Sequence, residues 1–363
     1  MESCFQWIET KYGLNANSSM TELNKVFRDW NMAALVFIGV LILPGIMGNS
    51  LVIAIFYKDF KKSAYRTFVL WLAVLDLAGC IIVMPYLMIN LITPVSMDNE
   101  IICKVGKFLS YTIMMTSYFI LVIIALDRYR KICRPHSLQI LQSQTSRYCL
   151  GMLTVSVIIS VPAPILYGNS SLEIGIPGLK ATRCFTMDKY KGTPAHLLYY
   201  AVINVLGATV TFIISVLYIL VIKRIRYQFH QKKHEIFPNI RRNEKLTQNA
   251  NTSEEKINRK LIRTTVTLLA VTILFVLTIF PHTVLSLIDY SVKNFFCRLS
   301  FEEGVVFNFA IHFFLLNNVL NCVIYGFTDK QFKRRILLLF RRQEFNLSES
   351  SDATSNRIEE KEV

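Results

Sequence analysis

Residues 108–130 read FLSYTIMMTSYFILVIIALDRYR, and within them residues 108–126 carry no charged side chain. A helix needs about 20 apolar residues to cross the hydrocarbon core of a bilayer. Because lipid offers no hydrogen-bond partners, such a segment must satisfy its backbone groups internally, as a helix does. The stretch therefore predicts a transmembrane helix whose charged end, Asp127-Arg128-Tyr129, lies at the membrane boundary.

Six further runs of similar character surround this one, and only one of them carries a charge, at Asp76. With 53% hydrophobic and 18% charged residues, the chain is also too apolar for a soluble protein of 363 residues. We therefore predict an all-α fold, a bundle of seven transmembrane helices. The other six runs cover residues 31–57, 67–97, 148–172, 192–222, 264–288 and 304–328.

The predicted domain order is a 1–30 extracellular tail, a 31–328 bundle, a 329–342 amphipathic helix and a 343–363 disordered cytoplasmic tail. Orientation follows from the basic residues, which concentrate in cytoplasmic loops. With the N-terminus outside, the cytoplasmic segments hold 29 of the 40 Lys and Arg residues. The expected location is the plasma membrane. The net charge of +15 then reflects topology, and no basic region interleaved with aromatics indicates nucleic-acid binding.

The segments outside the bundle carry further signals. Sequons at Asn17 and Asn169 fall on the outer side and predict glycosylation. Residues 329–342 place Phe332, Ile336, Leu339 and Phe340 on one helical face beside basic residues, which suits contact with anionic membrane lipid. The last 21 residues are too polar to fold alone. Their serines suit phosphorylation, which would add negative charge that a basic partner protein could bind, although a merely solubilising tail fits equally.

Two intramembrane features indicate function. Asp127 and Arg128 can pair with each other, and a guanidinium can exchange that partner for carbonyls of a docking protein; the alternative is an arginine that only marks the interface. A carboxylate such as Asp76 in mid-membrane costs about 3 kcal/mol or more without partners. It therefore indicates either an ion site or a structural polar network that includes Asn49.

Several motifs agree in spacing along the chain, and together they resemble the rhodopsin-like (class A) G-protein-coupled receptors. Among these the chain looks most like an invertebrate-type neuropeptide receptor that diverges in helices four to seven. The motifs are Gly48-Asn49, Leu72-Ala73 with Asp76, Cys103 located 25 residues before Arg128, Asp127-Arg128-Tyr129, Phe275 with Pro281, and Asn321-Cys322-Val323-Ile324-Tyr325 followed by Phe332.

The resemblance implies roles for particular residues. A disulfide would join Cys103 to Cys184, while the other external cysteines, Cys4 and Cys297, either form a second pair or stay free. An allosteric sodium ion, with no other cofactor, would lie among Asp76, Ser117, Asn317 and Asn321. The switch that couples to a heterotrimeric G protein would comprise Asp127, Arg128, Tyr129, Tyr218, Pro281, Asn321 and Tyr325.

The chain also departs from the family pattern. Ile279 replaces an aromatic residue, Cys322 replaces the proline of helix seven, and Val210 replaces that of helix five. Near the expected reach of Arg128 on helix six stand Leu261, Thr264 and Thr265, with no acid. Restraint of the resting state would then depend on Asp127 and a threonine hydroxyl, which predicts elevated basal activity.

The ligand class follows mainly from absences. Ser110 stands where amine receptors carry an aspartate, and residues 304–328 contain no lysine for a retinal Schiff base. A long segment, 172–182, predicts a hairpin lid as in many peptide receptors. We expect a neuropeptide or peptide hormone, with a small lipid or metabolite as the alternative.

A transporter is disfavoured by the lack of inverted repeats, and no motif of an enzyme is present. Candidate pocket residues, any of which could instead serve packing, are Tyr86, Lys107, Ser110, Tyr111, Met114, Tyr199, His282, Asp289, Phe307 and Ile311.

Overall fold

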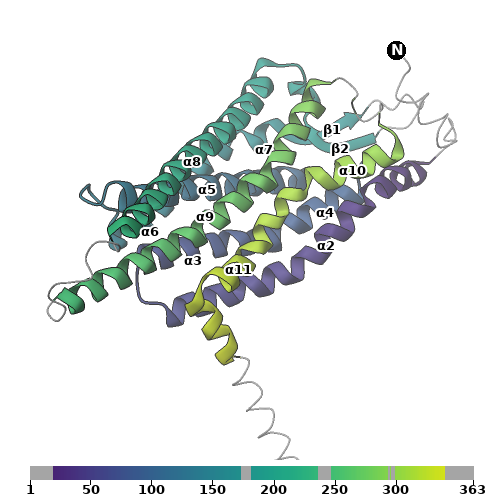
Figure 1. Ribbon diagram of the computed structural model, residues 1–363. Coiled ribbons are helices and arrows are strands. Elements are labelled where there is room, and N and C mark those ends of the chain that lie inside the picture. The colour runs from purple at the N-terminus through teal and green to yellow at the C-terminus, as the bar shows by residue number, and fades with distance from the viewer. Residues whose placement is uncertain (1–18, 173–180, 236–246, 293–294, 296–298, 340–363) are drawn as a thin grey trace, which may run out of the picture.

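The computed structural model describes residues 19–172, 181–235, 247–292, 295 and 299–339, with side chains omitted for 229–235, 247–259 and 290. Within these residues, seven helical spans are long and apolar enough to cross a bilayer. They run alongside one another in an elongated bundle (Figure 1). The elements are α2 Met20–Asp59, α3 Ala64–Ala78 continued by a π turn Gly79–Val83 and α4 Met84–Ile92, α5 Glu100–Cys133, α6 Gln142–Ser160 with α7 Ala163–Leu166, α8 Pro194–Glu235, α9 Thr247–Ser291, and α10 Phe301–Ile311 with α11 Asn317–Thr328.

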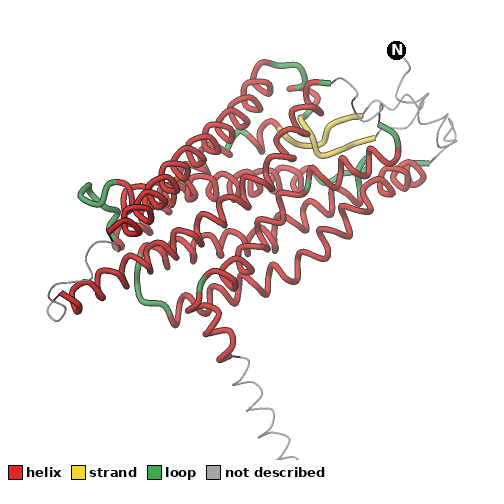
Figure 2. Tube along the Cα trace, viewed as in Figure 1, coloured by secondary structure: helices red, strands yellow, loops and turns green. Residues whose placement is uncertain are grey.

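The bundle has two distinct ends. Strands β1 (Tyr167–Leu172) and β2 (Ala181–Thr186) form an antiparallel hairpin at one end, which we call the hairpin end (Figure 2). A further helical stretch, residues 330–339, leaves the bundle at the other end, which we call the Arg128 end (Figure 1). The predicted seven-helix all-α architecture is thus confirmed, with the hairpin as its one sheet in the described part of the chain.

Several helices extend beyond the charge-free runs, and the bounds of the first, second and fourth spans differ from the expected ones as follows. Helix α2 begins at Met20, inside the segment predicted as a tail, because Ser19 and Glu22 form a reciprocal capping box. The second span ends at Ile92 and not at residue 97. The fourth was expected to reach residue 172, which was wrong: its last six residues (YGNSSL) are uncharged but mostly polar, and they form strand β1.

Irregular turns interrupt the second and seventh spans. The π turn Gly79–Val83 ends two residues before Pro85, which has no backbone N–H to continue the helical ladder. The seventh span breaks at His312, and a 3₁₀ turn over Phe313–Leu316 separates α10 from α11. Cys322 stands in place of the usual proline, yet this break lies about two turns earlier. Pro281 lies inside α9, which stays helical through it.

The short helix 330–339 is fixed to the bundle by its start. The Asp329 carboxylate accepts hydrogen bonds from the backbone N–H of Gln331 and Phe332, at 2.9 and 3.1 Å, and from the Tyr65 hydroxyl at 2.9 Å. Phe332 is buried against the rings of Phe56 and Tyr325. Of the predicted apolar face, Phe332 and Ile336 pack on the core and Leu339 is exposed, while Phe340 lies outside the described residues.

Candidate functional site

The hairpin is joined covalently to the start of α5. Cys103 and Cys184 form a disulfide, as expected. Asn169 and Cys184 are register partners between the two strands, and the Tyr86 hydroxyl lies 3.3 Å from the sulfur of Cys184. The hairpin therefore covers this end of the bundle at a fixed place. The second predicted pair, Cys4 and Cys297, lies outside the described residues, as does the sequon at Asn17.

Asn169 lies in the strand that the sequence assigned to a helix end. Its side-chain Nδ2, the atom to which a glycan would attach, donates a hydrogen bond of 2.9 Å to the carbonyl oxygen of Asp98. A glycan on Asn169 would replace one of the two hydrogens on this nitrogen and leave the other to donate to Asp98. Glycosylation here remains a prediction.

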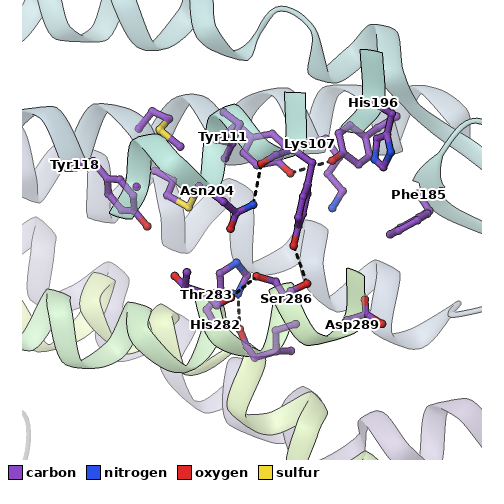
Figure 3. Close-up of a pocket in the computed structure, with 17 residues that line it drawn as sticks. Lys107, Tyr111, Tyr118, Phe185, His196, Asn204, His282, Thr283, Ser286 and Asp289 are labelled. Carbon is purple, nitrogen blue, oxygen red and sulfur yellow. Dashed lines mark hydrogen bonds between the residues drawn. The ribbon is translucent and has the colours of Figure 1, made fainter. Parts of the chain in front are cut away.

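A cavity of about 220 Å³ lies beneath the hairpin, between α5, α8 and α9 (Figure 3). Its walls are mainly aromatic and aliphatic with a few polar groups, as is usual in ligand sites. Of the predicted pocket residues, Lys107, Tyr111, Met114, His282, Asp289 and Ile311 line it.

A second cavity of about 330 Å³ adjoins the first on the side of α2 and α10. Lys107, Phe185, Asp289 and Ile311 contribute to both cavities, so the two share a wall under the hairpin, and we call them together the branched cavity. Phe307 lines the second cavity, as predicted for a pocket residue. Ser110 and Met114 line a third, deeper pocket towards the middle of the bundle.

Two of the predicted pocket residues support the cavity wall without lining it. The ring of Tyr86 packs where any side chain at Gly106 would stand. Tyr199 is buried, and its ring meets that of Tyr111 edge to face at 6.0 Å between centroids. Both residues therefore fix neighbouring side chains of the cavity in place.

Hydrogen bonds hold the α9 side of the first cavity. His282 Nδ1 lies 2.8 Å from the carbonyl oxygen of Ile311, so this nitrogen carries the proton and donates it. The His282 ring also packs edge to face on Phe314. The hydroxyl of Tyr200, on α8, donates to the carbonyl oxygen of Ser286 at 2.7 Å. The cavity wall thus connects α8, α9 and α10.

Charged groups of both signs meet where the two cavities join. Lys107 Nζ lies 5.3 Å from the centroid of the Tyr167 ring, and the guanidinium of Arg183 lies 4.4 Å from that of Phe185. Burial lowers the pKa of Arg183, and the nearby Asp289 carboxylate partly opposes that shift. Arg183 was not among the predicted residues. It lies in the short strand β2, whose sequence shows no periodic pattern that would indicate the direction of its side chain.

Other lining residues escaped the sequence-based prediction for a similar reason. Their polar groups belong to helix positions that hydropathy cannot distinguish from packing positions. They include Trp30, Asn31, His196, Tyr200, Asn204, Thr283, Ser286 and His312.

A polar network occupies the middle of the bundle. Asn321 Nδ2 donates to the Asp76 carboxylate at 2.7 Å, and Asn49 Nδ2 donates to the carbonyl oxygen of Asn318 at 2.7 Å. The amide oxygens of Asn49, Asn317 and Asn321 are buried with no hydrogen-bond partner among the described residues. Ser117, on α5, is also buried, and its hydroxyl donates a hydrogen bond of 3.1 Å to the carbonyl oxygen of Ile113. Three amide oxygens of the network therefore accept no hydrogen bond from the described residues.

At the Arg128 end, a buried guanidinium joins α5 to α9. Arg128 is 2% exposed; its Nη2 lies 2.5 Å from the Asp127 carboxylate, and its Nη1 donates to the Thr264 hydroxyl at 3.1 Å. Lys131, which the prediction overlooked, also pairs with Asp127 at 2.8 Å. The expected contacts of Arg128 with Asp127 and a threonine hydroxyl are therefore present, and no acid of the described part of α9 contacts Arg128.

Three further switch candidates are Tyr218, Tyr325 and Tyr129. We call the contacts of Arg128 with Asp127 and Thr264 the lock on Arg128. Tyr218 is buried and accepts a 3.3 Å hydrogen bond from the Thr272 hydroxyl. Tyr325 is 1% exposed, and its hydroxyl has no partner in the described residues. Tyr129 instead faces outward, with the Arg134 guanidinium 6.0 Å from its ring centroid. The structure thus places Tyr218 and Tyr325 inside the bundle and Tyr129 at its periphery.

Seven apolar helices around a buried polar network, with a covered cavity at one end, define a multi-pass membrane protein of the receptor type. The sequence profile of the 7 transmembrane receptor (rhodopsin family) matches residues 48–325. The chain therefore belongs to the rhodopsin family of seven-transmembrane receptors.

Individual relatives share parts of this chain. The GQ-coupled rhodopsin of Mizuhopecten yessoensis is 27% identical over 77% of the chain and 54% of its own length. The cholecystokinin receptor type A of Rattus norvegicus is 31% identical over 39% of the chain and 33% of its own length. The neuropeptide S receptor of Rattus norvegicus is 25% identical over 59% of the chain and 56% of its own length. The chain thus spans about half, or less, of the length of these relatives.

Proposed function

We propose that this protein is a receptor that converts binding of a ligand at the hairpin end into activation of a heterotrimeric G protein at the Arg128 end. One observation carries the proposal: α9 contributes His282 and Asp289 to the cavity and Thr264 to the lock on Arg128. A ligand that displaces one end of this helix can thereby release the other.

The release requires little energy. Arg128 has one interhelical hydrogen bond, to a neutral hydroxyl, and its partner Asp127 is shared with Lys131. Hydrogen bonds to charged groups contribute about 1.5–3 kcal/mol. A restraint of that size is within reach of ordinary differential ligand binding. It also supports the proposal of elevated basal activity.

A peptide is the ligand class that we propose. The names of two relatives, a cholecystokinin receptor and a neuropeptide S receptor, support it. The branched cavity under a disulfide-bonded hairpin offers room for a side chain in each branch. A rhodopsin is also among the relatives, but residues 304–328 contain no lysine to bind retinal. A small lipid or metabolite is the second candidate, since the walls are largely apolar.

We further propose the plasma membrane as the location, with the N-terminus outside and the C-terminus in the cytoplasm. The support is the concentration of Lys and Arg in the segments at the Arg128 end. Helix 330–339 would then rest on the inner leaflet and contact anionic lipid through Lys330, Lys333 and Arg334. The serines of the last residues would serve a kinase and arrestin.

An allosteric sodium ion is also proposed, held by Asp76, Ser117, Asn317 and Asn321. The fit rests on the donor set: one carboxylate with amide and hydroxyl oxygens, which suit a hard cation. The unpartnered amide oxygens of Asn317 and Asn321 support it. No cluster of three or more His, Cys, Asp or Glu residues in the described chain suggests a transition metal instead.

Guanine nucleotide exchange on purified heterotrimeric G proteins tests the proposed function without a known ligand. The full-length receptor in lipid nanodiscs should accelerate exchange on at least one G-protein class, and Arg128→Ala should abolish the effect. Arg130→Ala is the matched control, since this exposed arginine on the same helix contacts only the Leu138 carbonyl. Unchanged exchange by Arg128→Ala, or no acceleration for any class, would refute the proposal.

A further inference from the structure

Two partly buried cations face the branched cavity, and neither has a carboxylate partner among the described residues. Lys107 and Arg183 both line its second branch. In the described part of the chain, neither forms an ion pair within 4.0 Å, and Arg183 Nε is buried with no hydrogen-bond partner. Each cation instead lies over an aromatic ring, Tyr167 and Phe185 respectively.

A buried charge without a counter-charge is unfavourable, and ring contacts recover only part of the lost hydration. Two other cations of the described chain do have carboxylate partners. Lys104, one turn before Lys107 and also partly buried, pairs with Glu100 at 2.6 Å. Arg128 is buried and pairs with Asp127. Lys107 and Arg183 have no such partner among the described residues, which leaves both free to bind one on a ligand.

The local charge balance limits what that partner can be. Asp289 lines both branches and interacts with Arg183 electrostatically, but it lies beyond ion-pair distance. Two cations and one carboxylate leave a net charge of about +1 on the wall. A singly charged anion balances that charge, whereas a dianionic phosphate would exceed it. A guanidinium also matches the planar geometry of a carboxylate.

We propose that the ligand carries a carboxylate that binds between Lys107 and Arg183, with its apolar part against the aromatic walls around Tyr111 and Phe185. This inference rests on the proposed function, because it takes the branched cavity as the ligand site. A peptide with a free C-terminus or an acidic side chain would supply the group, as would a fatty acid. Asp289 competes with the ligand carboxylate for Arg183.

Thermal unfolding of the purified full-length receptor tests the inference with two matched pairs of probes. N-acetylphenylalanine and its amide represent a peptide end, and decanoate and decanamide represent a lipid. At millimolar concentration the acid of the favoured pair should raise Tm by a few degrees, and its amide should not. Which acid acts identifies the source of the carboxylate.

Variants separate the proposed contact from general binding. Lys107→Gln and Arg183→Gln should each remove most of the acid-dependent shift, and Lys104→Gln should keep it. Asp289→Asn should enlarge it, because a competing carboxylate is gone. Equal shifts by acid and amide, no shift with either acid, or retention of the shift in both glutamine variants would overturn the inference.

A ligand-free measurement guards against variants that fail for structural reasons. If Lys107 and Arg183 serve to bind a ligand and not to stabilise the fold, neutral replacements should leave the Tm of the ligand-free receptor unchanged or higher. A lower Tm in Lys107→Gln and Arg183→Gln would assign both cations a structural role and overturn the inference. None of these readouts uses a G protein. A receptor that activates no G protein would therefore defeat the proposed function and leave the acid-binding result standing.

Discussion

Replacing Thr264 with valine should raise ligand-free signalling, because it removes the one hydrogen bond by which α9 holds Arg128. Valine has nearly the volume of threonine, so the packing between α5 and α9 changes little. The Thr264 hydroxyl also donates to the Leu261 carbonyl at 3.0 Å, a bond within α9. The substitution therefore removes two bonds, of which only one joins two helices.

The size of the effect follows from the bond that is lost. A hydrogen bond to a charged group contributes about 1.5–3 kcal/mol, and 1.4 kcal/mol corresponds to tenfold in an equilibrium constant. The freed guanidinium nitrogen regains part of that energy from water or from Asp127. We therefore expect the active population, and the ligand-free exchange rate, to rise about tenfold where the wild type is far from saturation.

Ligand-free nucleotide exchange in nanodiscs measures this rise, with surface expression in cells as a check on folding. Thr265→Val is the matched control: its hydroxyl donates only to Leu261, at 2.8 Å, and does not reach Arg128. Thr264→Glu should act in the opposite direction, since a carboxylate would form an ion pair with Arg128. If Thr264→Val and Thr265→Val raise exchange equally, the Arg128 bond is not the restraint.

Three further substitutions test other parts of the structure. Asp76→Asn should make ligand-free exchange insensitive to replacing choline chloride with sodium chloride; persistence of the wild-type sodium response would argue against the proposed ion site. Cys184→Ser should lower the stability of the purified receptor by about 2–4 kcal/mol, because it opens a disulfide that spans 81 residues, and an unchanged unfolding midpoint in denaturant would contradict this. Phe332→Ala should lower the free energy of unfolding by about 3–5 kcal/mol, since this ring is 1% exposed and packs against Phe56. Leu339→Ala, at a position that is 46% exposed, is the control. Equal losses of stability in the two variants would show that helix 330–339 is not anchored as described.

The features that follow from composition and covalent chemistry could be predicted from the sequence. Long charge-free runs determine membrane spans because the bilayer imposes one requirement along the whole segment. The Cys103–Cys184 disulfide and the contact of Arg128 with a threonine also agree with expectation, since the resemblance to a known family located both. These features do not depend on the direction in which a particular side chain points.

Features set by local competition could not be predicted. Residues 167–172 (YGNSSL) carry no charge, which placed them in the predicted span, but four of the six are glycine or polar residues and the segment pairs with β2. The capping box at Ser19 adds turns to α2 before the apolar run begins. Arg183 interacts electrostatically with Asp289 across the fold, and no spacing along the chain reveals this. Lys131 lies four residues after Asp127 on the same helix, so its ion pair could have been predicted from the spacing but was overlooked.

The distance between the Arg128-end segments of α3 and α9 is the most direct test of how the signal passes through the bundle. Spin labels can be placed on the exposed residues Lys62 and Lys260 in a Cys133→Ser background, and the distance distribution read by pulsed electron resonance. A population at longer distance should be small in the wild type, larger in Thr264→Val, and dominant when nucleotide-free G protein is bound. A single unchanged distribution in all three samples would contradict the proposed movement of α9.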